Sequence, residues 1–198
     1  MKITLLILAL FITFIIISQL YFKMAKTETQ AYKIIKTEKD FEIRLYPSAT
    51  MASISMDAKT YRELSSSGFR RLASFIFGGN QSNKSIAMTT PVHMDINDSL
   101  SSMSFVMPAN YSKDNLPKPN DSTINIKTTS EEYVAAIRFS GYANDTEIKK
   151  YSTKLESALK ASGIEYYGNF RFLGYNAPYQ FLGRKNEIIV SVNWNVKD

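Results

Sequence analysis

Residues 68–92 read GFRRLASFIFGGNQSNKSIAMTTPV, and they carry the strongest indication of fold in the chain. The first part of this stretch continues an apolar stripe at helical spacing. The pair Gly78-Gly79 ends that helix, because glycine adopts the backbone of a helix C-terminus without strain. A polar loop follows, and the run from Ile86 to Val92 predicts a buried strand. No other stretch of the chain carries so specific a pattern.

The same order of elements is predicted twice along the chain. The first half contains strands 41–46 and 50–56, a helix over 61–77, and strands 85–95 and 103–108. The second half contains strands 124–128 and 132–139, a helix over 145–161, and strands 170–175 and 187–194. The stiff polar connector 117–121, which contains two prolines, joins the two halves.

Each helix is predicted from a single apolar face. In the first helix this face consists of Leu64, Gly68, Leu72, Phe75 and Ile76. In the second it consists of Ile148, Tyr151, Leu155, Ala158 and Leu159. Asn144 and Glu147 have the spacing of an N-terminal cap, and Gly163 suits the C-terminal end.

The repeat predicts an α+β fold with pseudo-twofold symmetry, β-β-α-β-β twice. The strands are expected to form a curved antiparallel sheet or distorted barrel with two helices packed against it. Each half has one apolar helix stripe and one apolar sheet face to bury. Pairing the two halves buries all of these surfaces. A cleft is expected between the helices and the sheet, or at the seam between the halves.

The composition excludes several classes of site. The 198 residues suggest one domain with appendages. The chain has no cysteine, which excludes disulfides, thiolate nucleophiles, cysteine zinc sites and iron–sulfur clusters. Its one histidine, His93, leaves at most one imidazole for a metal site or catalytic triad. The net charge of +6 comes without a basic run, so nucleic acid is not an expected partner.

Residues 3–22 form a nearly unbroken apolar run between Lys2 and Lys23. A run of about 20 apolar residues can cross a bilayer as a helix. No good cleavage site follows, so residues 1–23 are predicted as a transmembrane anchor, with a cleaved signal peptide as the alternative. Residues 24–31 are predicted as a linker and 32–196 as the folded domain. The lysines after the run favour a cytoplasmic domain, but large domains override that rule, so an exported domain stays open.

Nine short motifs follow one another in register over about residues 32–194. They are FEIRLY (41–46), GFRRL (68–72), FGGN (77–80), MTTPV (88–92), FVMP (105–108), LPKPND (116–121), FSG (139–141), GYNAP (174–178) and RKNE (184–187). In this order they resemble the SOUL family of haem-binding proteins. The resemblance implies a distorted antiparallel barrel of two similar halves. It also implies non-catalytic binding of haem or another tetrapyrrole in an apolar groove, similar to the cleft of effector-binding domains in drug-sensing regulators.

One residue departs from the pattern that the resemblance implies. Some members carry a histidine directly before the tyrosine of the first motif, and it is a proposed axial haem ligand. This chain has Leu45 there, which cannot bind iron. Other members lack that histidine and are thought to hold the porphyrin through apolar contacts and basic groups.

The first helix supplies most of the candidate haem-binding residues. Leu72, Phe75 and Ile76 are predicted to line a porphyrin groove, although such a stripe is more often core. Arg70 and Arg71 are expected to pair with the propionates, and otherwise to lie on a solvated helix face. Arg184 and Lys185 form a second, lower-ranked basic pair for the same role.

His93 is the candidate iron ligand, because imidazole commonly ligates haem iron. The alternative is a surface histidine, or one whose hydrogen bonds are satisfied, on a strand. The thioethers of Met88, Met94, Met103 and Met107 are weaker candidates, because strand methionines usually fill cores.

The sequence offers no convincing catalytic constellation, so the chain is not expected to be an enzyme. The leading hypothesis is therefore a membrane-tethered, non-catalytic carrier or buffer of haem. The alternatives are a binding module for another apolar or cationic small molecule, and a protein-interaction domain. The sequence leaves the oligomeric state open.

Overall fold

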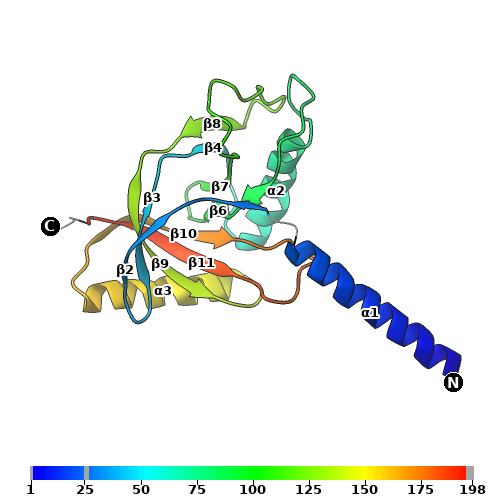
Figure 1. The fold of residues 1–198 in the computed structure, drawn as a ribbon. Helices are drawn as coiled ribbons and strands as arrows, with labels where there is room; N and C mark the ends of the chain where they lie inside the picture. Colours follow the sequence, from blue (N-terminus) through cyan, green and yellow to red (C-terminus); the bar gives the residue numbers. More distant parts are fainter. Residues whose placement is uncertain (1, 25–26, 195–198) are drawn as a thin grey trace.

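The computed structural model describes residues 2–24 and 27–194 (Figure 1). Helix α1 (Lys2–Met24) precedes a folded domain with helices α2 (Tyr61–Ile76) and α3 (Asp145–Ala161). The first half contains strands β1 (Glu28–Thr29), β2 (Lys33–Thr37), β3 (Glu42–Tyr46), β4 (Thr50–Met56), β5 (Thr89–Thr90), β6 (Val92–Asp95) and β7 (Ser101–Val106). The second half contains β8 (Asn125–Thr128), β9 (Glu132–Phe139), β10 (Tyr166–Gly174) and β11 (Asn186–Val192).

The main sheet shows the predicted duplication in its strand order. The described strands form a 9-stranded sheet in the order β2-β3-β9-β11-β10-β6-β7-β4-β8. Apart from β2 at its edge, this order is symmetric about the β10–β6 pair. β10 corresponds to β6, β11 to β7, β9 to β4 and β3 to β8. The fold is therefore α+β, with a curled antiparallel half-barrel and a pseudo-twofold axis between β10 and β6, as predicted.

The two faces of this sheet are covered differently. One face packs against α2 and α3 and carries the larger apolar core; it is called here the helix face. Side chains alternate along each strand, so the intervening residues lie on the opposite face. That face holds a smaller apolar cluster around Val134, Leu173 and Ile189, together with several buried polar groups.

Both domain helices begin with the cap that their sequence supplies. The Thr60 side chain accepts a hydrogen bond from the backbone of Glu63 at the start of α2. The Asn144 side chain accepts one from Glu147 at 2.9 Å at the start of α3, which confirms the predicted cap. The buried face of α2 is Leu64, Gly68, Leu72, Phe75 and Ile76, as the helical spacing predicts.

The turn after α2 explains the FGGN motif. Gly78 has a φ of 108°, which favours glycine. A Cβ added at Gly79 would lie 2.6 Å from the backbone oxygen of Ser74, so only glycine fits there. The fully buried Asn80 side chain donates to the carbonyls of Phe75 and Lys84 and accepts from the backbone of Ser82 and Lys84. This one amide therefore closes the loop that follows the helix.

Two parts of the sheet differ from the prediction. Residues 24–31 were expected as a linker, but β1 within them pairs in parallel with β5, and β2 adds a further strand beside β3. The predicted strand 85–95 is divided into β5 and β6 at Pro91, because proline has no backbone N–H to donate to a ladder. Short polar strands such as β2 carry little alternation, so the sequence pattern does not mark them.

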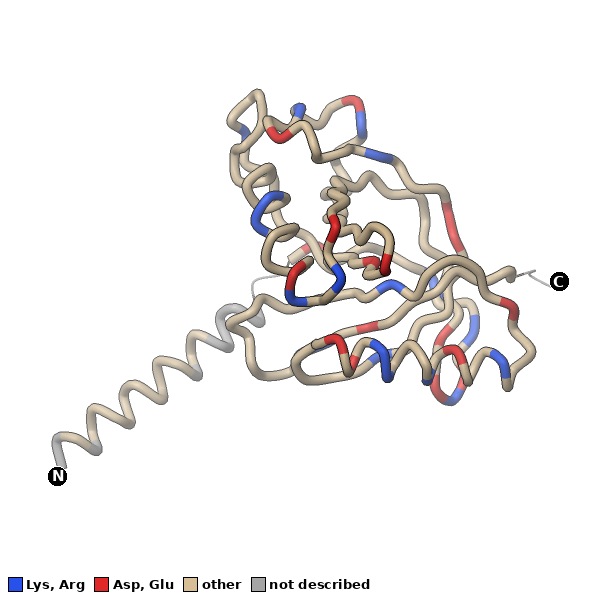
Figure 2. The backbone as a smooth tube through the Cα atoms, turned by 180° about the vertical axis from the view of Figure 1, so that it is seen from behind, with Lys and Arg blue, Asp and Glu red and all other residues tan. Residues whose placement is uncertain are grey.

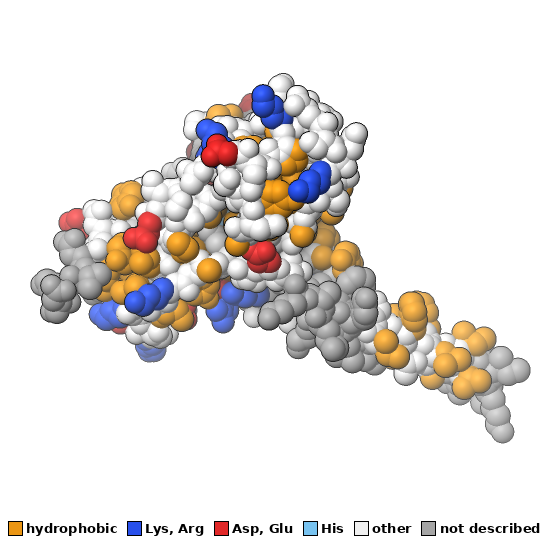
Figure 3. All heavy atoms as spheres, turned by 45° about the horizontal axis from the view of Figure 1, so that its top comes forward, with side chains coloured by type: hydrophobic (Ala, Val, Ile, Leu, Met, Phe, Trp, Pro, Cys, Tyr) orange, Lys and Arg blue, Asp and Glu red, His pale blue; other side chains and the backbone are white. Residues whose placement is uncertain are grey.

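Helix α1 extends away from the domain (Figure 1), and many of its apolar side chains are exposed along its length (Figure 3). Among the residues that the structure describes, no helix meets the length and apolarity required of a membrane span. Residue 1 lies outside the described residues, and the anchor at 1–23 stays a prediction from the sequence.

Candidate functional site

An apolar groove runs along the flank of α2 on the helix face of the sheet. Its volume is about 390 Å³, within the range of about 300–1,000 Å³ that is usual for small-molecule sites. Its walls come from α2, the two central strands and the loops at 142–143 and 176–184. The lining residues are Tyr61, Ser65, Ser66, Phe69, Val92, Met94, Tyr142, Ala143, Phe172, Gly174, Asn176, Pro178, Arg184 and Asn186. This cavity is called here the α2 groove.

Aromatic and aliphatic side chains form most of the α2 groove. Phe69 packs edge-to-face on the buried Phe105 with ring centroids 5.2 Å apart, which anchors it against the sheet. Tyr61 makes a similar contact with Phe172 at 5.4 Å. These contacts hold the aromatic walls in fixed orientations, so the groove is formed before any ligand enters.

Arg184 is the cationic group of the α2 groove. Its guanidinium lies over the ring of Tyr142, 4.5 Å from the centroid. Its Nη1 donates to the carbonyls of Ala177 and Gln180, at 3.0 and 2.6 Å. No described carboxylate pairs with it, and its Nε has no hydrogen-bond partner within the described residues. The groove therefore offers an acidic ligand group a cation that no acid of the described chain neutralises.

The structure places the predicted residues of the first helix outside this groove. Leu72, Phe75 and Ile76 are fully buried against the sheet and belong to the core. Arg71 forms a bidentate ion pair with Asp121, at 2.8 and 3.0 Å, and also donates to Thr123. Arg70 is exposed on the helix surface. The groove is lined instead by residues next to the stripe, such as Ser65 and Phe69.

His93 lies on the opposite face of the sheet from the α2 groove. Its neighbours on β6, Val92 and Met94, line the groove, and alternation turns the imidazole away from it. His93 is buried, and its Nε2 lies 2.8 Å from Oε1 of Gln30. Burial lowers the pKa of His93 to about 3, and nearby Arg171 and Lys127 act in the same direction. The imidazole is therefore neutral at ordinary pH and engaged by the segment before β2.

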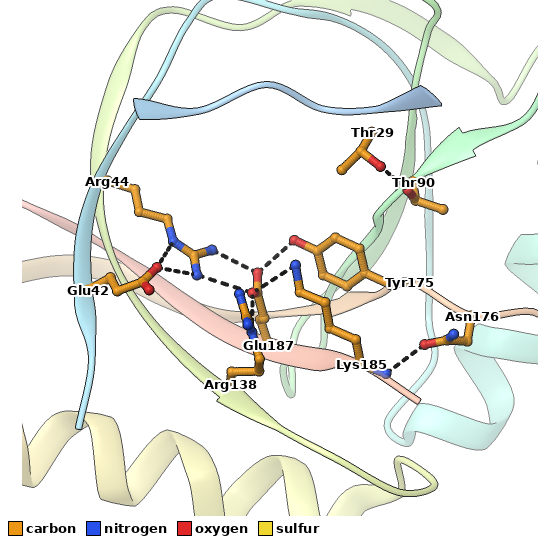
Figure 4. Close-up of polar contacts among 9 residues, drawn as sticks. All are labelled: Thr29, Glu42, Arg44, Thr90, Arg138, Tyr175, Asn176, Lys185 and Glu187. Atoms are coloured by element: carbon orange, nitrogen blue, oxygen red, sulfur yellow. Dashed lines mark hydrogen bonds and ion pairs between the residues drawn. The ribbon is translucent and has the colours of Figure 1, made fainter. Parts of the chain in front are cut away.

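A buried cluster of charges occupies the opposite face, and it is called here the charge cluster (Figure 4). Arg44 and Glu187 are 1% and 0% exposed and form a two-bond ion pair at 2.8 and 3.1 Å. The Glu187 carboxylate also accepts from Tyr175 at 2.6 Å, from Arg138 at 3.3 Å and from Lys185 at 3.2 Å. Five donor contacts saturate this carboxylate, so it is not available to a ligand.

The Tyr32 ring and a second carboxylate contact the Arg44 side chain of the charge cluster. Its guanidinium lies 4.2 Å from the centroid of the Tyr32 ring. Its Nε donates to Glu42 at 2.7 Å. Burial opposes the charge of Arg44, but its hydrogen bonds with Glu187 outweigh that effect and raise its pKa. The arrangement fixes the cation in place and stabilises the sheet where β3, β9 and β11 meet.

The same contacts set the acid–base state of the other members of the cluster. Burial opposes ionisation of Glu187, but hydrogen bonds and charge from Arg44 outweigh it and hold the pKa at about 2. Burial, together with Tyr46 and Glu187, raises the pKa of Tyr175 far above its usual range. Burial raises the pKa of Tyr46 to about 12, although Arg44 opposes this shift. Burial lowers the pKa of Lys185, although the contact with Glu187 opposes it.

The charge cluster was not identified from the sequence. Arg44 lies in the FEIRLY motif and Glu187 in the RKNE motif, and the strands that carry them are separated by β9 in the sheet. The only signal in the sequence was a charged residue at an inward position of each strand. A sequence pattern cannot show that two such residues, 143 positions apart, neutralise each other.

Comparison with known proteins identifies the family. A family model described as SOUL heme-binding protein matches residues 27–191. The chain belongs to the SOUL family. Heme-binding protein 1 of Xenopus laevis is 30% identical over 176 residues, which cover 83% of this chain and 89% of the relative. Human heme-binding protein 2 is 28% identical over 156 residues, covering 75% and 76%.

Solved structures extend the likeness of this SOUL protein in fold alone. The EcmrR C-terminal domain superposes with a TM-score of 0.57 at 9% identity, covering 82% of this chain and 98% of that domain. A hydrolase from Listeria innocua gives a TM-score of 0.57 at 8% identity, covering 80% and 94%. The SOUL half-barrel thus shares its architecture with effector-binding-domain-like proteins. Likeness of fold by itself therefore does not assign a function.

Proposed function

We propose that this SOUL protein binds haem or a similar tetrapyrrole in the α2 groove and acts as a non-catalytic carrier or buffer. Membership of the SOUL family supports the ligand class, and the apolar walls of the groove support its location. The single observation that carries the proposal is the cation of Arg184 at the rim of an apolar, preformed groove, where a propionate would find its partner.

The residues of the α2 groove fit a porphyrin held without an imidazole. Phe69, Phe172 and Tyr142 offer apolar and aromatic surface to a flat ring, and Met94 is the one thioether among the described lining residues. His93, the candidate ligand from the sequence, faces the other side of the sheet. Bound haem would supply the iron chemistry, while the chain would bind the ring and shield it from water.

The charge of the groove separates this proposal from its main alternative. A site for a cationic molecule is expected to place an acid in the cleft. The α2 groove has neither an Asp nor a Glu among its described lining residues, and Arg184 lies there instead. The buried acid of the domain, Glu187, lies in the charge cluster and is fully engaged. An anionic or neutral apolar ligand therefore suits the groove better than a cationic one.

The absence of catalysis is part of the proposal. Within the described residues no group of three or more His, Asp or Glu side chains is arranged to hold a metal ion. The fold itself is compatible with enzymes, since one structural neighbour is named a hydrolase. Turnover of model ester substrates tests it. A steady rate that rises with protein concentration and is lost when a groove residue is mutated would contradict the absence of catalysis.

Attachment to a membrane through residues 1–23, and the side on which the domain lies, are kept as predictions from the sequence. Fractionation of cells that express the full chain and a chain lacking residues 1–23 tests them. Recovery of both chains in the same soluble fraction would remove the tether from the proposal.

Titration of haemin into the full chain, followed in the Soret band, tests the binding proposal. We expect saturation at micromolar haemin, and about tenfold weaker binding in Arg184→Ala, since a hydrogen bond to a charged group contributes about 1.5–3 kcal/mol. Arg70→Ala is the matched control, because Arg70 is exposed and outside the groove, and we expect its affinity to be unchanged. His93→Leu is expected to leave the Soret spectrum unchanged. The absence of saturable binding would overturn the proposal.

A further inference from the structure

A second groove lies along α3, on the same face of the sheet as the α2 groove. Its volume is about 520 Å³, and Met94, Ile96, Ile148, Lys149, Phe170 and Phe172 are among its lining residues. We propose that this α3 groove is the pseudo-twofold mate of the α2 groove and binds a second molecule of the same class, a flat apolar ring that carries carboxylates. The ligand class rests on the function proposed above, whereas the existence of the groove does not.

The floors of the two grooves are related by the symmetry of the sheet. Met94 of β6 and Phe172 of β10 face each other in the ladder, on the pseudo-twofold axis, and both line both grooves. The α2 groove adds Val92 and Gly174, which are themselves paired. The operation that exchanges β6 and β10 carries Val92 onto Phe170 and Gly174 onto Ile96. Phe170 and Ile96 are both among the residues that line the α3 groove.

The helix walls follow the same operation. Ser65 is the fifth residue after the N-cap Thr60 of α2, and Lys149 is the fifth after the N-cap Asn144 of α3. Ser65 lines the α2 groove and Lys149 lines the α3 groove. The first residues of the two helices, Tyr61 and Asp145, correspond in the same way and each lines its own groove.

The two helices meet at the axis. The backbone N–H of Tyr61 donates to the carboxylate of Asp145 at 2.6 Å, which joins the N-terminus of α2 to that of α3. The two grooves therefore extend in opposite directions from one point, along the two helices. The two grooves are separate cavities. Met94 and Phe172 lie between them and line both.

A bulge in β10 opens the α3 groove. The pairing of β10 with β11 shifts register between Tyr167 and Arg171. Within the shift, Gly168 has a φ of 72° and open space where a side chain would begin. A bulge bends its strand and is often found beside a functional site. Here it makes Gly168, Asn169 and Phe170 part of the lining of the cavity below α3.

The chemistry of the α3 groove suits an apolar acid. Ile96, Ile148 and Phe170 supply apolar surface, and the exposed ammonium of Lys149 forms no ion pair with another described residue. The acid at the rim, Asp145, already accepts the backbone donor of α2. One free cation over an apolar floor is the same combination that Arg184 and its neighbours give the α2 groove.

Tryptophan at the two symmetry-related helix positions provides a matched test. Ser65→Trp fills the α2 groove and Lys149→Trp fills the α3 groove, each from the fifth residue of its helix. Haemin is titrated into the full-length wild type and both variants, and the number of equivalents bound at saturation is measured from the Soret band. The proposal expects two equivalents in the wild type and one in each variant. Unchanged far-UV circular dichroism and melting temperature show that each variant is folded.

The other outcomes distinguish the two proposals. One equivalent in the wild type that Ser65→Trp removes and Lys149→Trp leaves intact overturns the second groove and keeps the function. One equivalent that only Lys149→Trp removes supports the α3 groove and overturns the α2 location. No saturable binding overturns both. Lys149→Glu leaves the groove open, and we expect at least tenfold weaker binding of the second equivalent, whereas unchanged affinity would contradict the role of its charge.

Discussion

The imidazole of His93 shows how burial sets the properties of a single residue. The sequence offered it as an iron ligand, and the structure places it on the face away from both grooves, with Gln30 as its partner. Arg171 and Lys127 lie near enough to disfavour its protonation further, while Glu187 opposes them weakly. A neutral, buried imidazole is expected to contribute to stability, and that contribution depends on pH.

We predict that the free energy of unfolding falls by about 1 kcal/mol from pH 6 to pH 5. The unfolded chain binds a proton on His93 at a pKa near 6.5, whereas the folded chain holds that pKa at about 3. Stability is therefore full above pH 6.5 and is lost as the pH falls towards 3. Urea unfolding at both pH values measures the slope. Because the chain has one histidine, His93→Leu should remove it, and a slope that persists in the variant would contradict this origin.

We predict that Glu187→Gln lowers the free energy of unfolding at pH 7 by about 3–5 kcal/mol. The change keeps the shape of the side chain but leaves Arg44 buried without its main counter-charge. Glu42→Gln is the matched control, because Glu42 also contacts Arg44 but is partly exposed, and we expect a loss of about 1 kcal/mol. Denaturant unfolding of the three proteins measures both, and equal losses in the two variants would contradict the special role of Glu187.

The charge of Glu187 also predicts a second region of acid sensitivity. Its folded pKa of about 2 lies below the ordinary value of 4.5, so its contribution is present above pH 4.5 and lost as the pH falls through 2. In wild type we expect this loss to follow that of His93, at lower pH. Glu187→Gln should lack this second phase in a series of unfolding measurements from pH 5 to pH 2.

Among the elements, the turn after α2 depends on one buried side chain. The Asn80 side chain hydrogen-bonds to four backbone groups between Phe75 and Lys84. We predict that Asn80→Ala lowers the free energy of unfolding by about 2–3 kcal/mol, because it removes these bonds inside the domain. Gln81→Ala, at the exposed neighbouring position, should change it by less than about 0.5 kcal/mol. Thermal unfolding compares the pair, and similar melting temperatures would contradict the role of Asn80.

At the scale of the whole molecule, the domain has its own core. The buried apolar residues of both clusters lie between Phe41 and Val192, and none of those described belongs to α1. The core formed by the described residues of the half-barrel thus draws on the domain itself. Lys/Arg and Asp/Glu are interspersed along α3 and the surrounding loops (Figure 2), so the net charge of +6 is spread over the surface.

We predict that a chain lacking residues 1–26 folds with a melting temperature within about 2 °C of that of the full chain. Strand β1 is kept, so its pairing with β5 and the contact of Gln30 with His93 are preserved. Differential scanning calorimetry of the two chains measures this. A further deletion to residue 31 removes both contacts and serves as the comparison, with an expected fall of several degrees. A large fall in melting temperature already on deletion of residues 1–26 would contradict the prediction and show that α1 stabilises the domain.

The sequence predicted the elements well because each is specified locally. Helix 145–161 is predicted correctly from its cap and its apolar face, and the predicted strands 50–56 and 132–139 coincide with β4 and β9. The repeat of elements then implied the symmetric sheet. The bulge of β10 was not predicted, because Gly168 and Asn169 interrupt the alternation there and only pairing with β11 shows that the strand continues.

The helix residues that the sequence nominates for a ligand groove lie outside the α2 groove, because an apolar stripe and an open cavity have different origins. A stripe such as Leu72, Phe75 and Ile76 marks the face of a helix that the sheet covers, so these residues form core and leave no open space. The groove lies beside that stripe, where Ser65 and Phe69 meet residues from loops far along the chain. Arg184 is a weaker candidate than Arg70 and Arg71 from the sequence, yet it is the arginine that lines the α2 groove.

The amino-acid sequence alone was enough to predict both domain helices, most of the strands, their duplication, and the family to which the chain belongs. Those properties depend on the order and spacing of neighbouring residues. Strand pairing in the folded chain places Met94 and His93 on opposite sides of β6, brings Arg44 to Glu187, and makes Phe172 part of both grooves. These depend on which strands pair and in what register, because one residue of register moves a side chain to the other face of the sheet.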